Sequence, residues 1–182
     1  MKNFMIIIDG PMGSGKSTIG EIVHKKLKRT ALINTDKIKW LLSDFKRGSR
    51  DDEINFRVLL QMCEAYLQQG INLIIPQGFW KERVRTFINL AKRYKAQIYI
   101  YHLDAPKLIL LKRIKSREVS KDVRVPITKS RVLKNIQKWK QKKYLSGKLF
   151  ETNNFSKQRT AREILEEVLN GVGTPAKGIS ES

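Results

Sequence analysis

The segment from Gly10 to Ser17 constrains the fold more than any other part of this chain. It reads Gly-Pro-Met-Gly-Ser-Gly-Lys-Ser, follows the apolar run 4–8 and precedes an amphipathic stretch. This G-x-x-x-x-G-K-S pattern requires a strand, a loop and a helix in that order, because its backbone N–H groups curl around a polyphosphate at the helix N-terminus. The pattern predicts a buried strand over 4–8, a helix over about 16–29, and a bound nucleoside triphosphate between them.

The loop also indicates which atoms hold the triphosphate, which we expect to be ATP. Lys16 is predicted to reach the β- and γ-phosphates, and the Ser17 hydroxyl to take one position on Mg²⁺. The expected nucleotide-binding residues are Gly10, Pro11, Met12, Gly13, Ser14, Gly15, Lys16, Ser17 and Thr18.

Strand and helix signals alternate along the rest of the chain, which favours a parallel sheet with helices on both faces, a three-layer α/β/α arrangement. A chain of 182 residues suits one domain. We expect that domain over 1–170 and a flexible tail over 171–182. Further strands are predicted over 31–34, 71–75, 97–102 and 148–151, and further helices over 51–69, 81–94, 106–117, 128–144 and 156–170.

The composition gives indications about the cellular compartment of the protein and about its binding partners. Cys63 is the single cysteine and falls on the apolar side of a predicted helix, so it is expected to be a core residue. Short apolar runs and the need for ATP predict a cytoplasmic protein without a membrane span. The formal net charge is +20, and residues 107–148 hold 15 Lys and Arg against two acids. Such an excess fits either a solvated surface or a face that binds a polyanion such as nucleic acid.

Missing motifs narrow the class of nucleotide-binding protein. The chain has neither the Asn-Lys-x-Asp element of GTPases nor the Ser-Gly-Gly signature of transporter ATPases. Asp36 follows the second predicted strand, at the edge of the sheet where ligands of doubly wound folds bind. A carboxylate there can take the proton of an acceptor hydroxyl or orient it, although Asp36 could instead cap a helix over 37–42. These features favour a small phosphotransferase.

Basic residues after the fourth strand indicate a helical lid over about 113–130. Arg113 and Arg117 are four residues apart on one helix face, and Arg124 follows in a loop. Cations on a lid can stabilise the charge of the transferred phosphoryl group. For the acceptor we expect contacts from Lys39, Arg47, Gln77, Arg83 and Arg124.

Together with the phosphate loop and the two arginines, the segments Asn34-Thr35-Asp36 and His102-Leu103-Asp104-Ala105-Pro106 resemble the small P-loop kinases. This group includes polynucleotide 5′-hydroxyl kinase domains, zeta-toxin-like kinases, chloramphenicol phosphotransferase, and gluconate and shikimate kinases. The resemblance implies a P-loop kinase fold with a five-stranded parallel sheet, an ATP and Mg²⁺ site, and a lid. It further implies that Asp36 activates a hydroxyl, that Arg113 covers the adenine beside Asn153, and that Arg117 meets the phosphates.

Two residues depart from the pattern of these kinases. Lys39 stands where hydroxyl kinases often have arginine, and Gln77 where several have an acid that Asp9 or Asp104 could replace. The leading hypothesis is an ATP-dependent kinase whose acceptor is an RNA, nucleotide or small-metabolite hydroxyl. The alternatives are a nucleoside-monophosphate kinase and a nucleic-acid-binding protein that uses ATP as a ligand.

Overall fold

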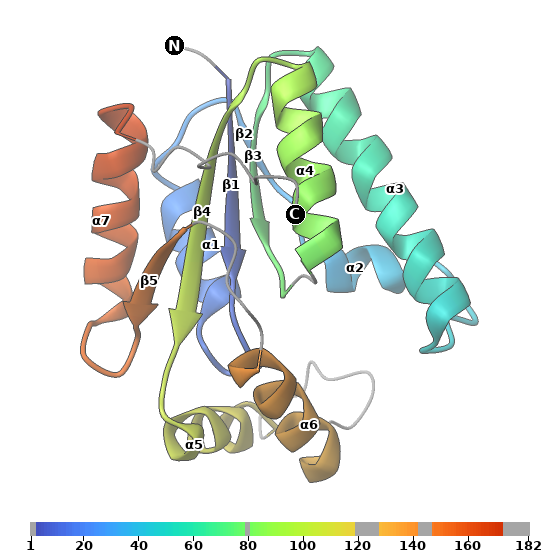
Figure 1. Cartoon of the computed structure of the whole chain (residues 1–182), viewed down its shortest axis with the longest axis vertical. Coiled ribbons are helices and arrows are strands. Elements are labelled where there is room, and N and C mark those ends of the chain that lie inside the picture. The colour runs from blue at the N-terminus through green and yellow to red at the C-terminus, as the bar shows by residue number, and fades with distance from the viewer. Residues whose placement is uncertain (1–2, 79–80, 119–127, 142–146, 173–182) are drawn as a thin grey trace.

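The structure, a computed structural model, describes residues 3–78, 81–118, 128–141 and 147–172. These residues form five strands and seven helices that alternate along most of the chain (Figure 1). In chain order they are β1 (Phe4–Asp9), α1 (Lys16–His24), β2 (Thr30–Leu32), α2 (Thr35–Lys39), α3 (Ser49–Gln68), β3 (Asn72–Pro76), α4 (Lys81–Arg93), β4 (Gln97–Asp104), α5 (Lys107–Glu118), α6 (Lys129–Lys140), β5 (Lys148–Glu151) and α7 (Lys157–Leu169).

The five strands make one sheet in the order β2-β3-β1-β4-β5, and each neighbouring pair is parallel. The predicted α/β class and five-stranded parallel sheet are therefore confirmed. In the centre of the sheet, Ile6 of β1 is in register with Ile74 of β3 on one side and Tyr99 of β4 on the other. Strands β1, β3 and β4 run toward the end of the sheet where α5 and α6 lie (Figure 1).

Two hydrophobic cores cover the two faces of the sheet, and β1 supplies both because successive side chains of a strand point to opposite faces. Met5 and Ile7 pack with α3 and α4, whereas Phe4, Ile6 and Ile8 pack with α1 and α7. A strand buried on both faces reads as a continuous apolar run, which is why its sequence shows no alternation. Cys63 of α3 is fully buried in the first core, as predicted.

Several element ends differ from the prediction. The first helix ends at His24 and not at Arg29. The N–H groups of Lys26 and Leu27 donate to carbonyl oxygens three residues back, as in a 3₁₀ turn, and Arg29 adopts a left-handed conformation with φ of 49°. The second strand ends at Leu32 because Asn34 leaves the sheet to cap α2, where its side chain accepts a hydrogen bond from the N–H of Asp36. Asn34, and not Asp36, is thus the helix cap.

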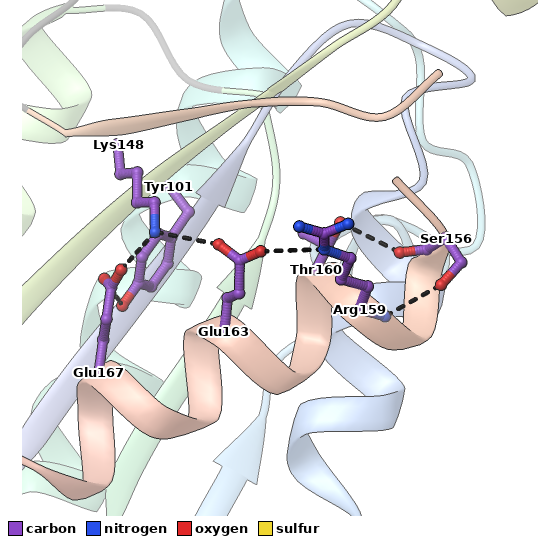
Figure 2. A network of polar contacts seen from close by, with 7 residues as sticks. All are labelled: Tyr101, Lys148, Ser156, Arg159, Thr160, Glu163 and Glu167. Carbon is purple, nitrogen blue, oxygen red and sulfur yellow. Dashed lines mark hydrogen bonds and ion pairs between the residues drawn. The ribbon is translucent and has the colours of Figure 1, made fainter. Parts of the chain in front are cut away.

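A polar network fastens α7 to the edge of the sheet (Figure 2). The Lys148 ammonium of β5 donates to Glu167 at 2.6 Å and to Glu163 at 3.2 Å, and the Tyr101 hydroxyl of β4 donates to Glu167 at 3.1 Å. At the start of α7 the Ser156 hydroxyl accepts from the N–H of Arg159, a standard helix cap. This network lies away from the phosphate loop and holds the scaffold that carries it.

Helices α5 and α6 lie beyond the ends of β1 and β4 and share a third, smaller core (Figure 1). Ala105, Leu110 and Ile114 pack there against Val132 and Ile136, with Met12 of the phosphate loop at the margin. The lid predicted over 113–130 is described only in part, since residues 119–127 lie outside the described residues, as do 173–182 of the predicted tail. In the part of the chain that the structure describes, no helix has the length and apolar character needed to cross a membrane.

Candidate functional site

The phosphate loop runs from the end of β1 to the start of α1, and its glycines have specific roles. Gly13 and Gly15 have φ of 81° and 100°, a region that residues with a side chain rarely adopt. A Cβ added to Gly10 would lie 2.5 Å from the carbonyl oxygen of Leu103, so the loop can pass this close to β4 only with glycine at that position. The predicted strand–loop–helix geometry is therefore present.

The interior of the loop has polar groups available for an anion. The Lys16 ammonium donates to the carbonyl oxygen of Pro11 at 2.8 Å, which holds its positive charge over the loop. Among the described residues, the hydroxyl of Ser14 is buried and has no hydrogen-bond partner. No side chain caps the N-terminus of α1, and its first turn contains no acidic residue. These residues fit a phosphate group, which would accept hydrogen bonds from the Ser14 hydroxyl and from the N–H groups at the start of α1.

A magnesium ion fits the loop only together with phosphate. Ser17 lies in the first turn of α1 with its side chain partly exposed. The described residues contain no group of three or more His, Cys, Asp or Glu that could hold a metal ion. This is consistent with the usual protein site for Mg²⁺, which combines one or two protein ligands with phosphate oxygens and water.

The two acids considered as substitutes at the metal site already have partners within the protein. Asp9 is fully buried, accepts a hydrogen bond from the N–H of Gly10 at 2.9 Å and lies 3.4 Å from Nδ1 of His102. The Asp104 carboxylate accepts from the N–H of Ala105 and pairs with Lys140 of α6. Both carboxylates therefore support the backbone around the loop.

Asp36 lies in the first turn of α2, directly after β2. Its carboxylate is exposed, with 66% of the side chain accessible, and pairs with the Lys39 ammonium at 3.0 Å. The Lys39 side chain is nearly buried, with 11% accessible. The pair joins the predicted catalytic carboxylate to a predicted acceptor-binding residue.

A small polar cavity of about 40 Å³ opens beside this pair. It is lined by Thr35, Lys39, Asp52, Asn55, Phe56, Leu59, Gln77, Gly78 and Arg83. Within the described parts of the chain, Thr35 Oγ1 and Asn55 Oδ1 are buried and have no hydrogen-bond partner, which is costly unless a ligand or water satisfies them. One lining residue, Gly78, packs against the start of the phosphate loop, since a Cβ on Gly78 would lie 3.2 Å from the carbonyl oxygen of Gly10.

Of the residues predicted to contact the acceptor, Lys39, Gln77 and Arg83 therefore meet in one cavity. The Arg83 guanidinium stacks on Phe56 at 4.4 Å from the ring centre and lies 3.6 Å from the Glu53 carboxylate. Arg47 lies outside the cavity lining, with its guanidinium 5.9 Å from the centre of the Trp40 ring. Arg124 lies outside the described residues.

Helix α6 supplies two residues that the sequence prediction missed. Asn135 accepts a hydrogen bond from the N–H of Met12 at 2.8 Å, so α6 holds the phosphate loop directly. Burial lowers the pKa of Arg131 and the nearby Arg47 lowers it further, whereas the carboxylates of Asp36 and Asp52 act in the opposite direction. The charge of Asp36 thus acts on Arg131, although no local sequence pattern indicates Arg131.

The predicted adenine-binding residues also come together. The Arg113 guanidinium of α5 donates to Thr152 at its hydroxyl (2.8 Å) and its carbonyl oxygen (2.7 Å). Thr152 directly precedes Asn153, which is exposed, so the two predicted residues lie on adjoining segments. The backbone of Arg117 lies in the last turn of α5.

Comparison with known proteins shows which family the chain matches. The model of a family described as an AAA domain, AAA_33, matches residues 5–142. Among curated proteins, a "Probable adenylyl-sulfate kinase" of Archaeoglobus fulgidus is 30% identical over 95 residues. That match covers 47% of this chain and 61% of the relative, so the chain matches less than two thirds of the length of this relative.

Solved structures of kinases share the fold. The structure of the Mycobacterium tuberculosis APS kinase in complex with AMPPNP and APS aligns with a TM-score of 0.63 and 14% identity, over 92% of this chain and 98% of that one. Shikimate kinase of Acinetobacter baumannii in complex with shikimate aligns with a TM-score of 0.58 and 19% identity, over 93% and 94% of the two chains. At this level of identity the likeness concerns the fold.

Proposed function

Because the chain belongs to the AAA_33 family of P-loop kinase domains, we propose that it is an ATP-dependent kinase that transfers the γ-phosphoryl group of ATP to a hydroxyl group. One observation carries the proposal: a polar cavity with unpaired buried oxygens adjoins the phosphate loop at Gly78 and Gly10 and contains Lys39, the partner of Asp36.

On the donor side, residues 10–18 would bind the triphosphate. Lys16 and the N-terminus of α1 would bind its negative oxygens, and the glycines would allow the backbone N–H groups to approach. A magnesium ion held through Ser17 would neutralise charge on the phosphates. Arg113 and Asn153 would lie beside the base, and Arg117 beside the phosphates.

On the acceptor side, the Asp36 carboxylate would orient the hydroxyl and receive its proton. The acceptor oxygen forms a bond to the γ-phosphorus while the bond from that phosphorus to the β-phosphate oxygen breaks, and ADP leaves. Asp36 is exposed and paired with Lys39.

The test of this mechanism is the Asp36→Asn variant, which keeps the shape of the side chain and removes its basicity. Loss of general-base catalysis lowers kcat by about 10²- to 10⁴-fold, with binding of ATP unchanged. The matched control is Asp44→Asn, another exposed carboxylate outside the cavity lining. Transfer of ³²P from ATP is measured with small polyols, nucleosides and an RNA with a free 5′-hydroxyl. If Asp36→Asn keeps turnover within a few fold of the wild type, the proposed role is wrong.

A nucleoside-monophosphate kinase is the second candidate, because two cations, Lys39 and Arg83, line the cavity and would suit a phosphate acceptor. A phosphate acceptor needs no base. This alternative therefore predicts rapid transfer to a nucleoside monophosphate and little effect of Asp36→Asn, which the same assay measures when monophosphates are added.

A further inference from the structure

An apolar groove lies between α2 and α3, next to the polar cavity. Its volume is about 230 Å³. It is lined by Ile38, Lys39, Leu41, Leu42, Phe45, Asp51, Ile54, Asn55 and Val58. Four of these residues are large apolar side chains that remain exposed: Leu41 (79%), Leu42 (40%), Ile54 (43%) and Val58 (40%). Single exposed apolar residues are ordinary, but four around one groove mark a binding surface.

The groove and the polar cavity share two lining residues. Lys39 and Asn55 line both of them, so the two spaces meet at these side chains. The Lys39 ammonium at this junction is the group that pairs with Asp36, and the Asn55 Oδ1 atom is one of the unpaired buried oxygens. A molecule that spans the junction would place polar groups beside the proposed base and an apolar portion along Leu42 and Val58.

We propose that the acceptor of this kinase is an amphipathic small molecule, whose reacting hydroxyl lies at the Lys39–Asn55 junction and whose hydrocarbon portion lies in the groove between α2 and α3. This inference rests on the proposed function. The size of the groove favours such an occupant over a protein, because nine residues line it, whereas a stable protein interface uses about 20–30 residues on each side. The mostly apolar lining with a few polar groups at one end is typical of a small-molecule site.

The first experiment measures binding without requiring turnover. Full-length protein with ¹³C-labelled Leu, Ile and Val methyl groups is saturated with the ATP analogue AMPPNP and titrated with primary n-alkanols from ethanol to hexanol. We expect shifts at the methyl groups of Leu41, Leu42, Ile54 and Val58, with affinity rising about fourfold for each added methylene. The exposed Leu108 and Leu169, at 78% and 55%, serve as internal controls.

The second experiment compares matched variants. The double variant Leu42→Asn/Val58→Thr removes apolar surface from the groove, and Leu169→Asn/Val172→Thr makes the same changes at exposed positions on and just after α7. We expect the groove variant to lose the dependence of affinity on chain length and the control variant to keep it. In ³²P transfer assays the groove variant should raise KM for alkyl-bearing acceptors about tenfold or more.

Several outcomes would overturn the proposal. In the titration, they are equal chemical-shift changes at control and groove methyl groups, or an alcohol affinity that does not depend on chain length. Chemical shifts of the groove methyl groups that change on dilution without alcohol would indicate self-association instead. In the transfer assay, the contrary result is a purely polar acceptor whose kcat/KM is the same for the groove variant and the wild type. Groove shifts without ³²P transfer to any acceptor would refute the proposed kinase function and leave the groove as a binding site. The two failures are therefore distinguishable.

Discussion

Replacing Gly10 by alanine tests whether the phosphate loop is held as closely against the sheet as the structure indicates. The added Cβ would lie 2.5 Å from the carbonyl oxygen of Leu103 and 2.6 Å from the hydroxyl oxygen of Ser14. The Ser14 side chain can rotate away. The Leu103 carbonyl cannot, because this residue is fully buried in β4 and in register with Phe150 of β5. The loop must therefore move away from its position over β4.

The expected cost follows from this overlap. Overpacking of a well-ordered site costs about 1–3 kcal/mol. If the loop takes the strain, each 1.4 kcal/mol weakens ATP binding tenfold, so the Kd for ATP rises about 5- to 150-fold. If the sheet takes part of the strain, the free energy of unfolding falls instead. The loss of ATP-binding free energy and the loss of unfolding free energy are expected to add up to about the overpacking cost.

The assay combines titration with a fluorescent ATP analogue and urea unfolding without nucleotide. Gly48→Ala is the matched control, because a Cβ there meets nothing within 4 Å and the backbone is extended. This control should change the free energy of unfolding by less than about 0.5 kcal/mol and leave the Kd unchanged. If Gly10→Ala matches the control in both measurements, the close approach to Leu103 does not exist and the loop geometry is wrong.

Two further predictions concern the scaffold. Burial raises the pKa of the Cys63 thiol from 9.0 to about 12, which leaves about a thousandfold less thiolate near pH 8. Ellman's reagent should therefore label the native protein far more slowly than the urea-unfolded chain. Rapid labelling of the native protein would contradict the burial of Cys63. Burial, and then the charge of Glu167, raise the pKa of Tyr101 above its ordinary 10.0, so its contribution to stability is complete below about pH 10 and is lost as the pH rises further. The urea midpoint of Tyr101→Phe should therefore fall less steeply than that of the wild type between about pH 9.5 and 11, and an equal decline would assign the alkaline loss to other groups.

The sequence predicted the parts of the fold whose signals are local. The glycine pattern at 10–17 fixed the first strand, loop and helix, and β5 was predicted with the observed bounds 148–151. The resemblance to small P-loop kinases is confirmed by the family match over residues 5–142. The predicted ends of α1 and β2 were wrong because tertiary structure determines where these elements end. Arg29 turns the chain into the sheet, and Asn34 leaves the sheet to cap α2.

The candidate site was harder to predict because its parts meet only through the topology. Lys39 follows β2, whereas Gln77 and Arg83 follow β3. The cavity that they line also includes Thr35 and Asn55, whose buried oxygens have no hydrogen-bond partner in the described structure. A sequence pattern identifies donors and acceptors but not which of them the fold leaves unsatisfied. The apolar groove was missed for a related reason, since its residues resemble ordinary core positions of α2 and α3.

The basic segment 107–148 contains several cations that interact with other residues of the protein. Three of its cations have specific roles within the protein: Lys140 pairs with Asp104, Lys148 with Glu163 and Glu167, and Arg113 donates to Thr152. A fourth, Arg131, interacts electrostatically with Asp36 and Asp52. The first three contacts fasten α5, α6 and β5 to neighbouring parts of the fold. These four of the 15 basic residues of the segment thus have interactions within the protein, and a nucleic-acid partner for the segment stays a prediction.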